Sequence, residues 1–578
     1  MTKASQIEAH LRERIAEERQ REQQMTAEGV YQRIAAGQIV RATGALVFHT
    51  APASFAEKLD AVLGMLKQYY PEGDAGLQQN SLQFLLKLAI DLRTFVPNWA
   101  LAKGLGGASI AAAAERVSQT LAALEGLGGP APAAVAAGLR SETMARLKAE
   151  GLTDAAQIEQ MTTALLGDTL VSYVTNISKE INSSNLIQVA RAMLRGETES
   201  ELGNDYAAFL QYTIWQGASF VTTNPVLVKM AWDIDPAFWN ARVDELIRSR
   251  YTPAELRAIL AGPAQGIQDA VTAINSLVTM CVVEENCRLL RDIFLVTGGE
   301  HGYVSLQVNP KNHSDGPAMV TEARALYNDL ERRFGGVPNV VFKLPATAAG
   351  LYAAEKLTEK GIGVNITVNF GVFQELGFGE VLDRGHALVA YLALMNGRMS
   401  FPVRDELKAR NVEGGVDAAR WAGVEVARKA YHGLYDPKDK GGLGISTKRV
   451  KLLIASLRIY GDWIPDISEL WGCPVITIFP NVRRAWDAHP RDFDGKAVLG
   501  VTPRKDLEIM LKSEIFRQAW WMPGDPVEWK PARVLTLDPA DAEELAKWPP
   551  VAQTLGQFID LYDQMGQLVV GRMKALAG

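Results

Sequence analysis

The chain has 578 residues and a formal net charge of -6, and 22% of its residues are charged and 48% hydrophobic. This is the composition of a soluble globular chain that is long enough for two or more domains. The acidic balance argues against a nucleic-acid partner. The sequence has no run of about 18 apolar residues, so we expect neither a transmembrane helix nor a membrane partner.

The compartment is predicted from the N-terminus and the cysteines. Residues 1–8 lack an apolar signal core, and three cysteines are too few for a disulfide framework. We therefore expect a cytoplasmic protein. Cys281 and Cys287 lack the spacing and the histidine partners of a zinc site, so we expect no metal and no cofactor.

Residues 1–165 are rich in Ala, Glu, Gln, Arg and Leu and have helical periodicity, which predicts a helical N-terminal region. Its opening segment, 11–20, is charged and carries only a thin apolar stripe. This pattern is typical of a solvated helix, and a coiled-coil or oligomer contact is the alternative, so the protein is a possible homo-oligomer.

Residues 166–500 have a different texture, in which short β-rich apolar runs alternate with helical stretches. The expected strands are 170–175, 219–223, 303–308, 340–344, 364–370, 388–395, 452–457 and 475–479. Eight such strands predict a (β/α)8 TIM barrel, although the runs alone also fit a doubly wound sheet. Residues 501–578 return to helix and are expected to form a C-terminal extension that packs on the barrel.

Lys343 closes one of these strands and is followed two residues later by Pro345. Because proline cannot donate to a sheet ladder, the strand must end here and the lysine must lie at its mouth. The carboxyl ends of barrel strands hold catalytic groups. A desolvated amine at such a place can lose its proton near neutral pH and attack a carbonyl to form a Schiff base.

Small amides, hydroxyls and arginines follow the other expected strands. They are Thr222, Thr223 and Asn224 after the second strand, Gln307 and Asn309 after the third, Asn365, Thr367 and Asn369 on the fifth, Arg398 after the sixth, and Ser456 and Arg458 after the seventh. The planar fork of arginine matches phosphate oxygens, and late barrel strands often bind phosphate. This set is typical of a Schiff-base enzyme for a phosphorylated sugar.

These segments resemble the transaldolase family of class I aldolases, over roughly residues 168–490. The matching stretches are 221–225, 304–308, 342–347, 363–367, 397–398 and 455–458, which occur in the family's order. The resemblance implies a transferase or lyase of carbohydrate metabolism, such as the pentose phosphate pathway, with a small sugar-phosphate substrate.

The resemblance also implies a role for each matching residue. Lys343 would be the Schiff-base lysine, and Thr367 would help to place the water used in imine formation. Asn224 and Asn365 would bind hydroxyls of the dihydroxyacetone unit. The remaining implied binding residues are Arg398, Ser456 and Arg458 for the phosphate, and Phe370 at the aromatic position of the fifth strand.

One departure concerns the acid/base group. Family members end the first strand with an aspartate that drives carbon–carbon bond cleavage, and alignment of 174–179 on that segment puts Thr175 there. Threonine cannot take up a proton near pH 7, so we expect this aspartate to be missing. Asp168, Glu180 and His313 are candidates to replace it.

Two other positions differ as well. Gln307 stands where transaldolases carry glutamate, as it does in the fructose 6-phosphate aldolase branch. Ala393 or a neighbour replaces a serine on the sixth strand.

The sequence thus predicts a transaldolase-like enzyme that forms an imine through Lys343 and transfers or releases a three-carbon unit. The first alternative is a catalytically altered or inactive relative that binds a sugar phosphate in a regulatory or structural role. The second alternative is an enzyme that keeps the imine but performs another reaction, such as isomerisation or dehydration.

Overall fold

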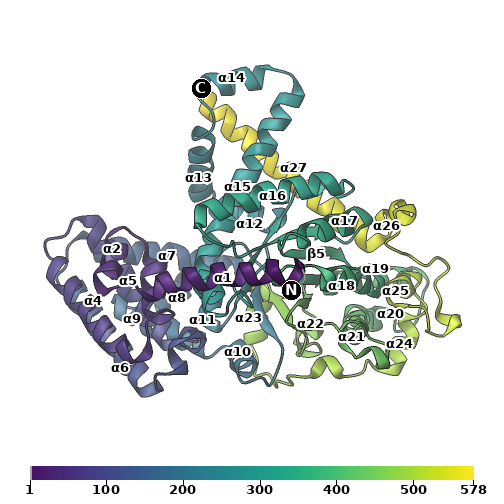
Figure 1. Ribbon diagram of the computed structural model, residues 1–578, viewed down its shortest axis with the longest axis horizontal. Coiled ribbons are helices and arrows are strands. Elements are labelled where there is room, and N and C mark those ends of the chain that lie inside the picture. The colour runs from purple at the N-terminus through teal and green to yellow at the C-terminus, as the bar shows by residue number, and fades with distance from the viewer. Residues whose placement is uncertain (1–2) are drawn as a thin grey trace.

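The protein, described here from a computed structural model covering residues 3–578, is built around a closed parallel β-barrel (Figure 1). Each strand pairs with the next in the chain, and β8 pairs with β1 to close the barrel. The strands are β1 (Glu201–Asn204), β2 (Phe220–Val221), β3 (Tyr303–Gln307), β4 (Val340–Pro345), β5 (Val364–Asn369), β6 (Ala390–Leu394), β7 (Val450–Ile454) and β8 (Val475–Ile478). The expected (β/α)8 barrel is confirmed, as is every expected strand from residue 219 onward.

The expected first strand at 170–175 is wrong, because these residues begin helix α9 (Leu170–Asn182). Thr169 caps the helix by accepting a hydrogen bond from the Ser172 amide, and the buried residues recur at helical spacing. Tertiary packing thus overrides the β-branched residues of the segment. The true first strand has only four residues, and they include a charged Glu201 and a glycine.

Helices precede, surround and follow the barrel. The N-terminal helices are α1 (Lys3–Gln23), α2 (Ala27–Ala35), α3 (Ile39–Val47), α4 (Phe55–Tyr69), α5 (Ala75–Arg93), α6 (Gly107–Glu125), α7 (Pro130–Ala149), α8 (Ala155–Leu166), α9 and α10 (Leu186–Leu194). Around the barrel lie α11 (Leu210–Gln216), α12 (Pro225–Ile234), α13 (Pro236–Arg248), α14 (Pro253–Ala261), α15 (Ala264–Val296), α16 (Gly316–Phe334), α17 (Ala348–Thr358), α18 (Val372–Arg384), α19 (Asn396–Ala409), α20 (Gly415–Ala418), α21 (Ala422–Tyr435), α22 (Pro465–Ser468) and α23 (Pro480–Asp487). The last helices are α24 (Arg504–Met510), α25 (Glu514–Trp520), α26 (Ala542–Lys547) and α27 (Pro549–Ala577).

The N-terminal helices form a lobe beside the barrel and share its hydrophobic core (Figure 1). The indole of Trp215 on α11 donates a 2.7 Å hydrogen bond to Asp91 on α5. At the same junction the buried carboxylate of Glu150 lies 2.8 Å from Arg483 on α23 and 2.8 Å from Arg146 on α7. Buried charges are stable only when they are paired in this way, so the lobe is fixed to α23 in one orientation.

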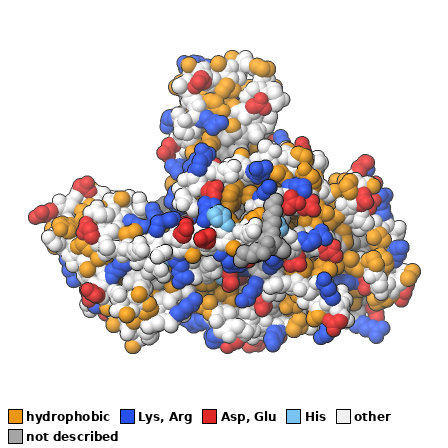
Figure 2. All heavy atoms as spheres, viewed as in Figure 1, with side chains coloured by type: hydrophobic (Ala, Val, Ile, Leu, Met, Phe, Trp, Pro, Cys, Tyr) orange, Lys and Arg blue, Asp and Glu red, His pale blue; other side chains and the backbone are white. Residues whose placement is uncertain are grey.

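Helix α1 covers the end of the barrel where the strands begin. Leu11 and Ile15 are buried there against Tyr303, Tyr391 and other residues near the strand starts. The thin apolar stripe of this charged helix is therefore a barrel contact. On the face shown in Figure 2, acidic and basic side chains are interspersed over the N-terminal lobe and the barrel.

Helices α12 to α15 and the C-terminal half of α27 form a projection with its own core (Figure 1). Helix α15 is long and apolar enough to cross a membrane by length and composition, and half of its apolar window is buried inside the protein. Buried core helices of soluble proteins meet the same criteria of length and composition. Helix α27 runs from the projection to the barrel mouth, so the C-terminal extension packs on the barrel.

A buried ion pair lies near the strand starts. The Nζ atom of Lys451 on β7 is 2.6 Å from Glu201 on β1, and His301 lies 3.0 Å from the same carboxylate. Burial alone would raise the pKa of Glu201, but Lys451 and His301 hold that pKa well below its usual value. The pair joins two strands on either side of β8.

Removal of one partner should destabilise the protein, because it leaves an uncompensated charge in the core. We expect Lys451→Met to lower the free energy of unfolding by about 3–5 kcal/mol, measured by urea denaturation. The double variant Glu201→Gln/Lys451→Met should recover most of this loss. A single variant as stable as the wild type would contradict this account of the pair.

Candidate active site

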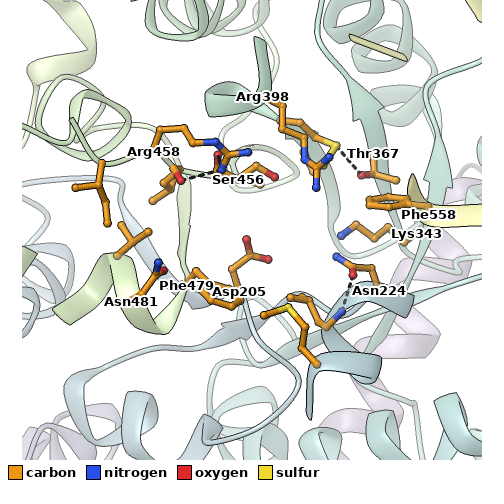
Figure 3. A pocket seen from close by; sticks show the side chains of 18 residues that line it. Asp205, Asn224, Lys343, Thr367, Arg398, Ser456, Arg458, Phe479, Asn481 and Phe558 are labelled. Carbon is orange, nitrogen blue, oxygen red and sulfur yellow. Dashed lines mark hydrogen bonds between the residues drawn. The ribbon is translucent and has the colours of Figure 1, made fainter. Parts of the chain in front are cut away.

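A cavity of about 420 Å³ opens at the carboxyl ends of the strands (Figure 3). Its walls come from the loops after several strands and from the C-terminal helix α27. The polar side chains that line it are Asp205, Asn224, Lys343, Thr367, Arg398, Ser456, Arg458 and Asn481. Several positions expected from sequence therefore meet in one place, together with residues that were not expected.

Lys343 lies on β4, between Gln307 of β3 and Asn365 of β5 in the sheet register. The residue is 4% exposed, and its side chain reaches the cavity. Burial, reinforced by the positive charge of Arg398, lowers the pKa of Lys343 to about 8, although Asp205 opposes the shift. A substantial fraction of the amine is therefore neutral, and so nucleophilic, near physiological pH.

Asp205 directly follows β1 and faces the same cavity (Figure 3). Its backbone amide donates to the Ile478 carbonyl at 3.2 Å, and its carboxylate accepts a hydrogen bond from Thr222. The prediction that Thr175 is the strand-one residue is wrong, since Thr175 lies exposed on α9 and donates to the Val171 carbonyl. The end of the true first strand carries an aspartate.

The groups suggested as replacements for that aspartate do not line the cavity. Asp168 precedes α9. Glu180 lies on α9, where it accepts a 2.7 Å hydrogen bond from Tyr212. His313 follows β3 and accepts a hydrogen bond from Thr347 through its carbonyl oxygen. Among residues 3–578, Asp205 alone supplies a carboxylate to the cavity lining.

Two guanidinium groups lie across the cavity from Asp205, and Arg398 is on the same side as Thr367 and Lys343 (Figure 3). Burial and the charge of Arg458 lower the pKa of Arg398 to about 10, and burial lowers the pKa of Arg458. Arg458 Nη1 donates to the carbonyl oxygens of Ser456 and Leu457 at 2.8 and 3.0 Å. Within residues 3–578 neither guanidinium forms a salt bridge with a carboxylate. The Asp466 carboxylate accepts a 2.7 Å hydrogen bond from the Arg458 backbone amide and offsets part of the Arg458 charge. Two adjacent, partly desolvated guanidinium groups still favour an anion.

The C-terminal helix contributes two contacts that the sequence did not reveal. Arg398 Nη1 donates a 2.6 Å hydrogen bond to Gln557 Oε1, and the Arg398 guanidinium lies 5.9 Å from the centroid of the Phe558 ring. Phe558 also lines the cavity. Apolar periodicity would identify Phe558 only as a core residue, so its place at the mouth could be found only from the fold.

Asn224 and Thr367 lie where the sequence predicted. Asn224 caps α12, and its Oδ1 accepts from the Leu227 amide at 2.9 Å. With the carbonyl oxygen so engaged, the Asn224 NH₂ group is its donor toward the cavity. Thr367 Oγ1 contacts Met395 Sδ at 3.7 Å. Ala393, which was expected to stand in place of the family's serine, also lines the cavity.

Three other expected residues are buried and do not belong to the cavity lining. Gln307 donates weakly to the Lys343 carbonyl at 3.4 Å. Asn365 is fully buried, and neither of its amide atoms has a partner in the described part of the chain. Phe370 is fully buried and packs edge-on against Trp548, with ring centroids 6.2 Å apart. Asn365 is next to Lys343 in register, so its unpaired amide is available to a group held at that lysine.

Strained backbone occurs at Ser456 of the cavity lining and at two barrel positions outside that lining. Ser456, Val368 and Phe209 have positive φ angles of 61°, 55° and 56°, which side chains other than glycine rarely adopt. They follow or belong to β7, β5 and β1. Such strain persists where surrounding structure enforces it, often at functional sites. Within residues 3–578 no group of three or more His, Cys, Asp or Glu side chains could hold a metal ion.

Comparison with known proteins agrees with this architecture. The sequence model of the Transaldolase/Fructose-6-phosphate aldolase family matches residues 204–519, so the match begins directly before Asp205. A transaldolase from Neisseria meningitidis serogroup C is 27% identical over 286 residues, covering 46% of this chain and 72% of its own length. A transaldolase from Neisseria gonorrhoeae is 31% identical over 279 residues with the same coverage, and one from Thiobacillus denitrificans is 30% identical over 227 residues, covering 37% and 56%. The closed barrel, the family match across more than half of the chain and these relatives together show that the chain belongs to the transaldolase/fructose-6-phosphate aldolase family.

Proposed function

We propose that the protein is a transaldolase-like enzyme that forms a Schiff base between Lys343 and a phosphorylated ketose and transfers or releases a three-carbon unit. The observation that carries this proposal is the joint presence of the Lys343 amine, the Asp205 carboxylate and two guanidinium groups in one cavity. The lysine supplies the nucleophile, the aspartate supplies the base, and the guanidinium groups bind the phosphate.

The chemistry begins at Lys343. Its neutral amine attacks the ketose carbonyl, and loss of water gives a positively charged imine. Asp205 then takes the proton from the hydroxyl on the fourth carbon, which is the carbon that becomes the aldehyde. The bond between the third and fourth carbons breaks, an aldehyde leaves, and the bonding electrons pass to the imine nitrogen and form an enamine.

The second half of the reaction runs in reverse with another aldehyde. The enamine carbon attacks the acceptor carbonyl, Asp205 returns its proton to the new alkoxide, and water hydrolyses the imine to free Lys343. When no acceptor binds, a proton replaces it and dihydroxyacetone is released. Thr367 lies beside the lysine and is suited to hold the water of imine formation and hydrolysis.

Phosphate binding places the substrate in this account. Arg398 and Arg458 would bind the phosphate, while Asn224 and Asn365 would bind hydroxyls near the imine carbon. Two charge-assisted anchors at one end of the substrate hold its carbonyl toward Lys343 and so lower the entropic cost of attack.

The reading of the chain as an inactive sugar-phosphate binder rested on the missing acid. Asp205 in the cavity removes that reason. The second alternative, an enzyme that forms the imine but performs isomerisation or dehydration, also depended on the missing aspartate. It therefore loses its support as well.

Borohydride trapping tests the proposal. We expect a reduced adduct of fructose 6-phosphate or dihydroxyacetone on Lys343, seen by mass spectrometry of the intact protein and of its peptides. Lys343→Ala should abolish the adduct. Lys360→Ala, which removes an exposed lysine after α17, should leave it unchanged. Wild-type protein that gives no adduct with either ketose would refute the imine.

The pH dependence of trapping should report the lowered pKa of Lys343. The amine is protonated and unreactive below its pKa, so the trapping rate should rise with pH and level off above a midpoint near 8. Asp205→Asn removes a negative charge that favours the ammonium form and should move the midpoint down. Arg398→Met removes a repelling positive charge and should move it up. Two shifts in the same direction would contradict this electrostatic account.

The contact between Arg398 and Gln557 generates a test of phosphate binding. Gln557→Glu puts a carboxylate beside Arg398, which would compete with the substrate phosphate. We expect KM for fructose 6-phosphate to rise about tenfold or more, with little change in the trapping of dihydroxyacetone, which has no phosphate. Gln553→Glu, an exposed change one turn earlier on α27, is the control. Equal effects of the two variants would argue against Arg398 as a phosphate ligand.

A further inference from the structure

A second cavity, of about 530 Å³, lies where the N-terminal lobe meets the barrel and the projection. Its walls come from α7, from the segment after β1, and from helices α12, α13 and α15. None of its lining residues lines the active-site cavity. The proposed reaction makes no use of it.

The two cavities are neighbours across the segment that carries Asp205. Tyr206 lines the second cavity, and its ring packs edge-on against Phe479, with centroids 5.3 Å apart and an interplanar angle of 82°. Phe479 lines the active-site cavity. Asn286 of the second cavity donates to the Ala207 carbonyl at 3.1 Å and so holds this segment in place.

The charged residues of the second cavity are all acidic. Glu142, Asp235 and Glu285 line it, and no lysine or arginine does. The Asp235 carboxylate caps α13, and Glu285 has two loose partners, Arg242 at 3.8 Å and Cys281 Sγ at 3.9 Å. Within residues 3–578 Glu142 forms no salt bridge; the residue is exposed, desolvation raises the pKa of its carboxyl, and the charge of Arg146 opposes that rise. Three carboxylates around one cavity that has no basic lining residue favour a positively charged ligand.

The rest of the wall is mostly apolar and aromatic. Trp239, Phe209 and Tyr206 contribute rings, and Phe238 stands at the edge with half of its surface exposed (50%). Tyr206 is fully buried, yet its hydroxyl has no hydrogen-bond partner in the described part of the protein. Aromatic faces attract cations, and an unpaired buried hydroxyl favours a polar ligand atom. Apolar lining with a few polar groups is the usual composition of a small-molecule site.

We propose that this cavity is a second ligand site, which binds a small apolar molecule carrying one positive charge. The ammonium group would pair with Glu142, and the apolar part would lie against Trp239 and Phe209. The site does not depend on the proposed function. An amine has no carbonyl with which Lys343 could react, so binding can also be measured with Lys343→Ala.

The test uses 2-phenylethylamine and its neutral counterpart, 2-phenylethanol, in isothermal titration calorimetry and ligand-observed NMR. We expect the amine to bind in the millimolar range, as suits a fragment of this size, and the alcohol to bind about tenfold or more weakly. Glu142→Gln should weaken the amine to the level of the alcohol. Glu57→Gln, an exposed change on α4, should not.

A matched glycine pair tests the location. Gly138 on α7 lines the cavity, and a Cβ atom added there would meet no atom within 4 Å, so the helix should accept Gly138→Leu, whose side chain we expect to occupy part of the cavity. Gly64 on α4 is an exposed helical glycine with equally open surroundings, and Gly64→Leu should bind like the wild type. Amine binding that survives Gly138→Leu, equal binding of amine and alcohol, or no binding of the amine to the wild type would each overturn the proposal.

Discussion

Burial of the Lys343 amine in the carboxyl-terminal half of β4 is the constraint on which the site depends. A charged lysine that is almost fully buried is costly, and the cost appears as a pKa lowered to about 8. Asp205 limits this shift, while Arg398 increases it. The same two residues are the proposed base and phosphate anchor, so the charges that would bind and cleave the substrate also adjust the nucleophile.

Both ends of the chain contribute to the barrel. The N-terminal lobe holds α23 through Glu150 and Arg483, and α23 carries Asn481 into the cavity wall. At the other end, α27 brings Gln557 and Phe558 to Arg398. Helix α1 covers the opposite end of the barrel. The helical regions are thus part of the site's support, although they lie largely outside the family match at residues 204–519.

The sequence predicted the barrel and much of the site because strong local patterns mark them. Runs of β-branched residues identify the strands from 219 onward, and Pro345 places Lys343 at a strand end. β1 escaped prediction because its four residues include a charge and a glycine. Glu201 is stabilised there by Lys451 and His301, which come from distant parts of the chain, and by a hydrogen bond from Ser219. That error moved the first strand to α9 and hid Asp205.

Contacts between distant segments explain the other differences. Nothing near Gln557 in the sequence indicates that it meets Arg398, 159 residues away. In contrast, Asn365 and Gln307 were expected in the site and lie beside Lys343 in register, but neither belongs to the cavity lining. A local pattern places a residue on a strand, whereas the shape of the closed barrel decides whether its side chain reaches the opening.

The central claim is that Asp205 drives bond cleavage after Lys343 has formed the imine. The most direct test is Asp205→Asn, with imine trapping and turnover of fructose 6-phosphate measured on the same preparation. The account predicts that the Lys343 adduct of dihydroxyacetone still forms at a pH where the amine is neutral, while turnover falls about 100-fold or more. Turnover close to that of the wild type, with the adduct intact, would contradict it.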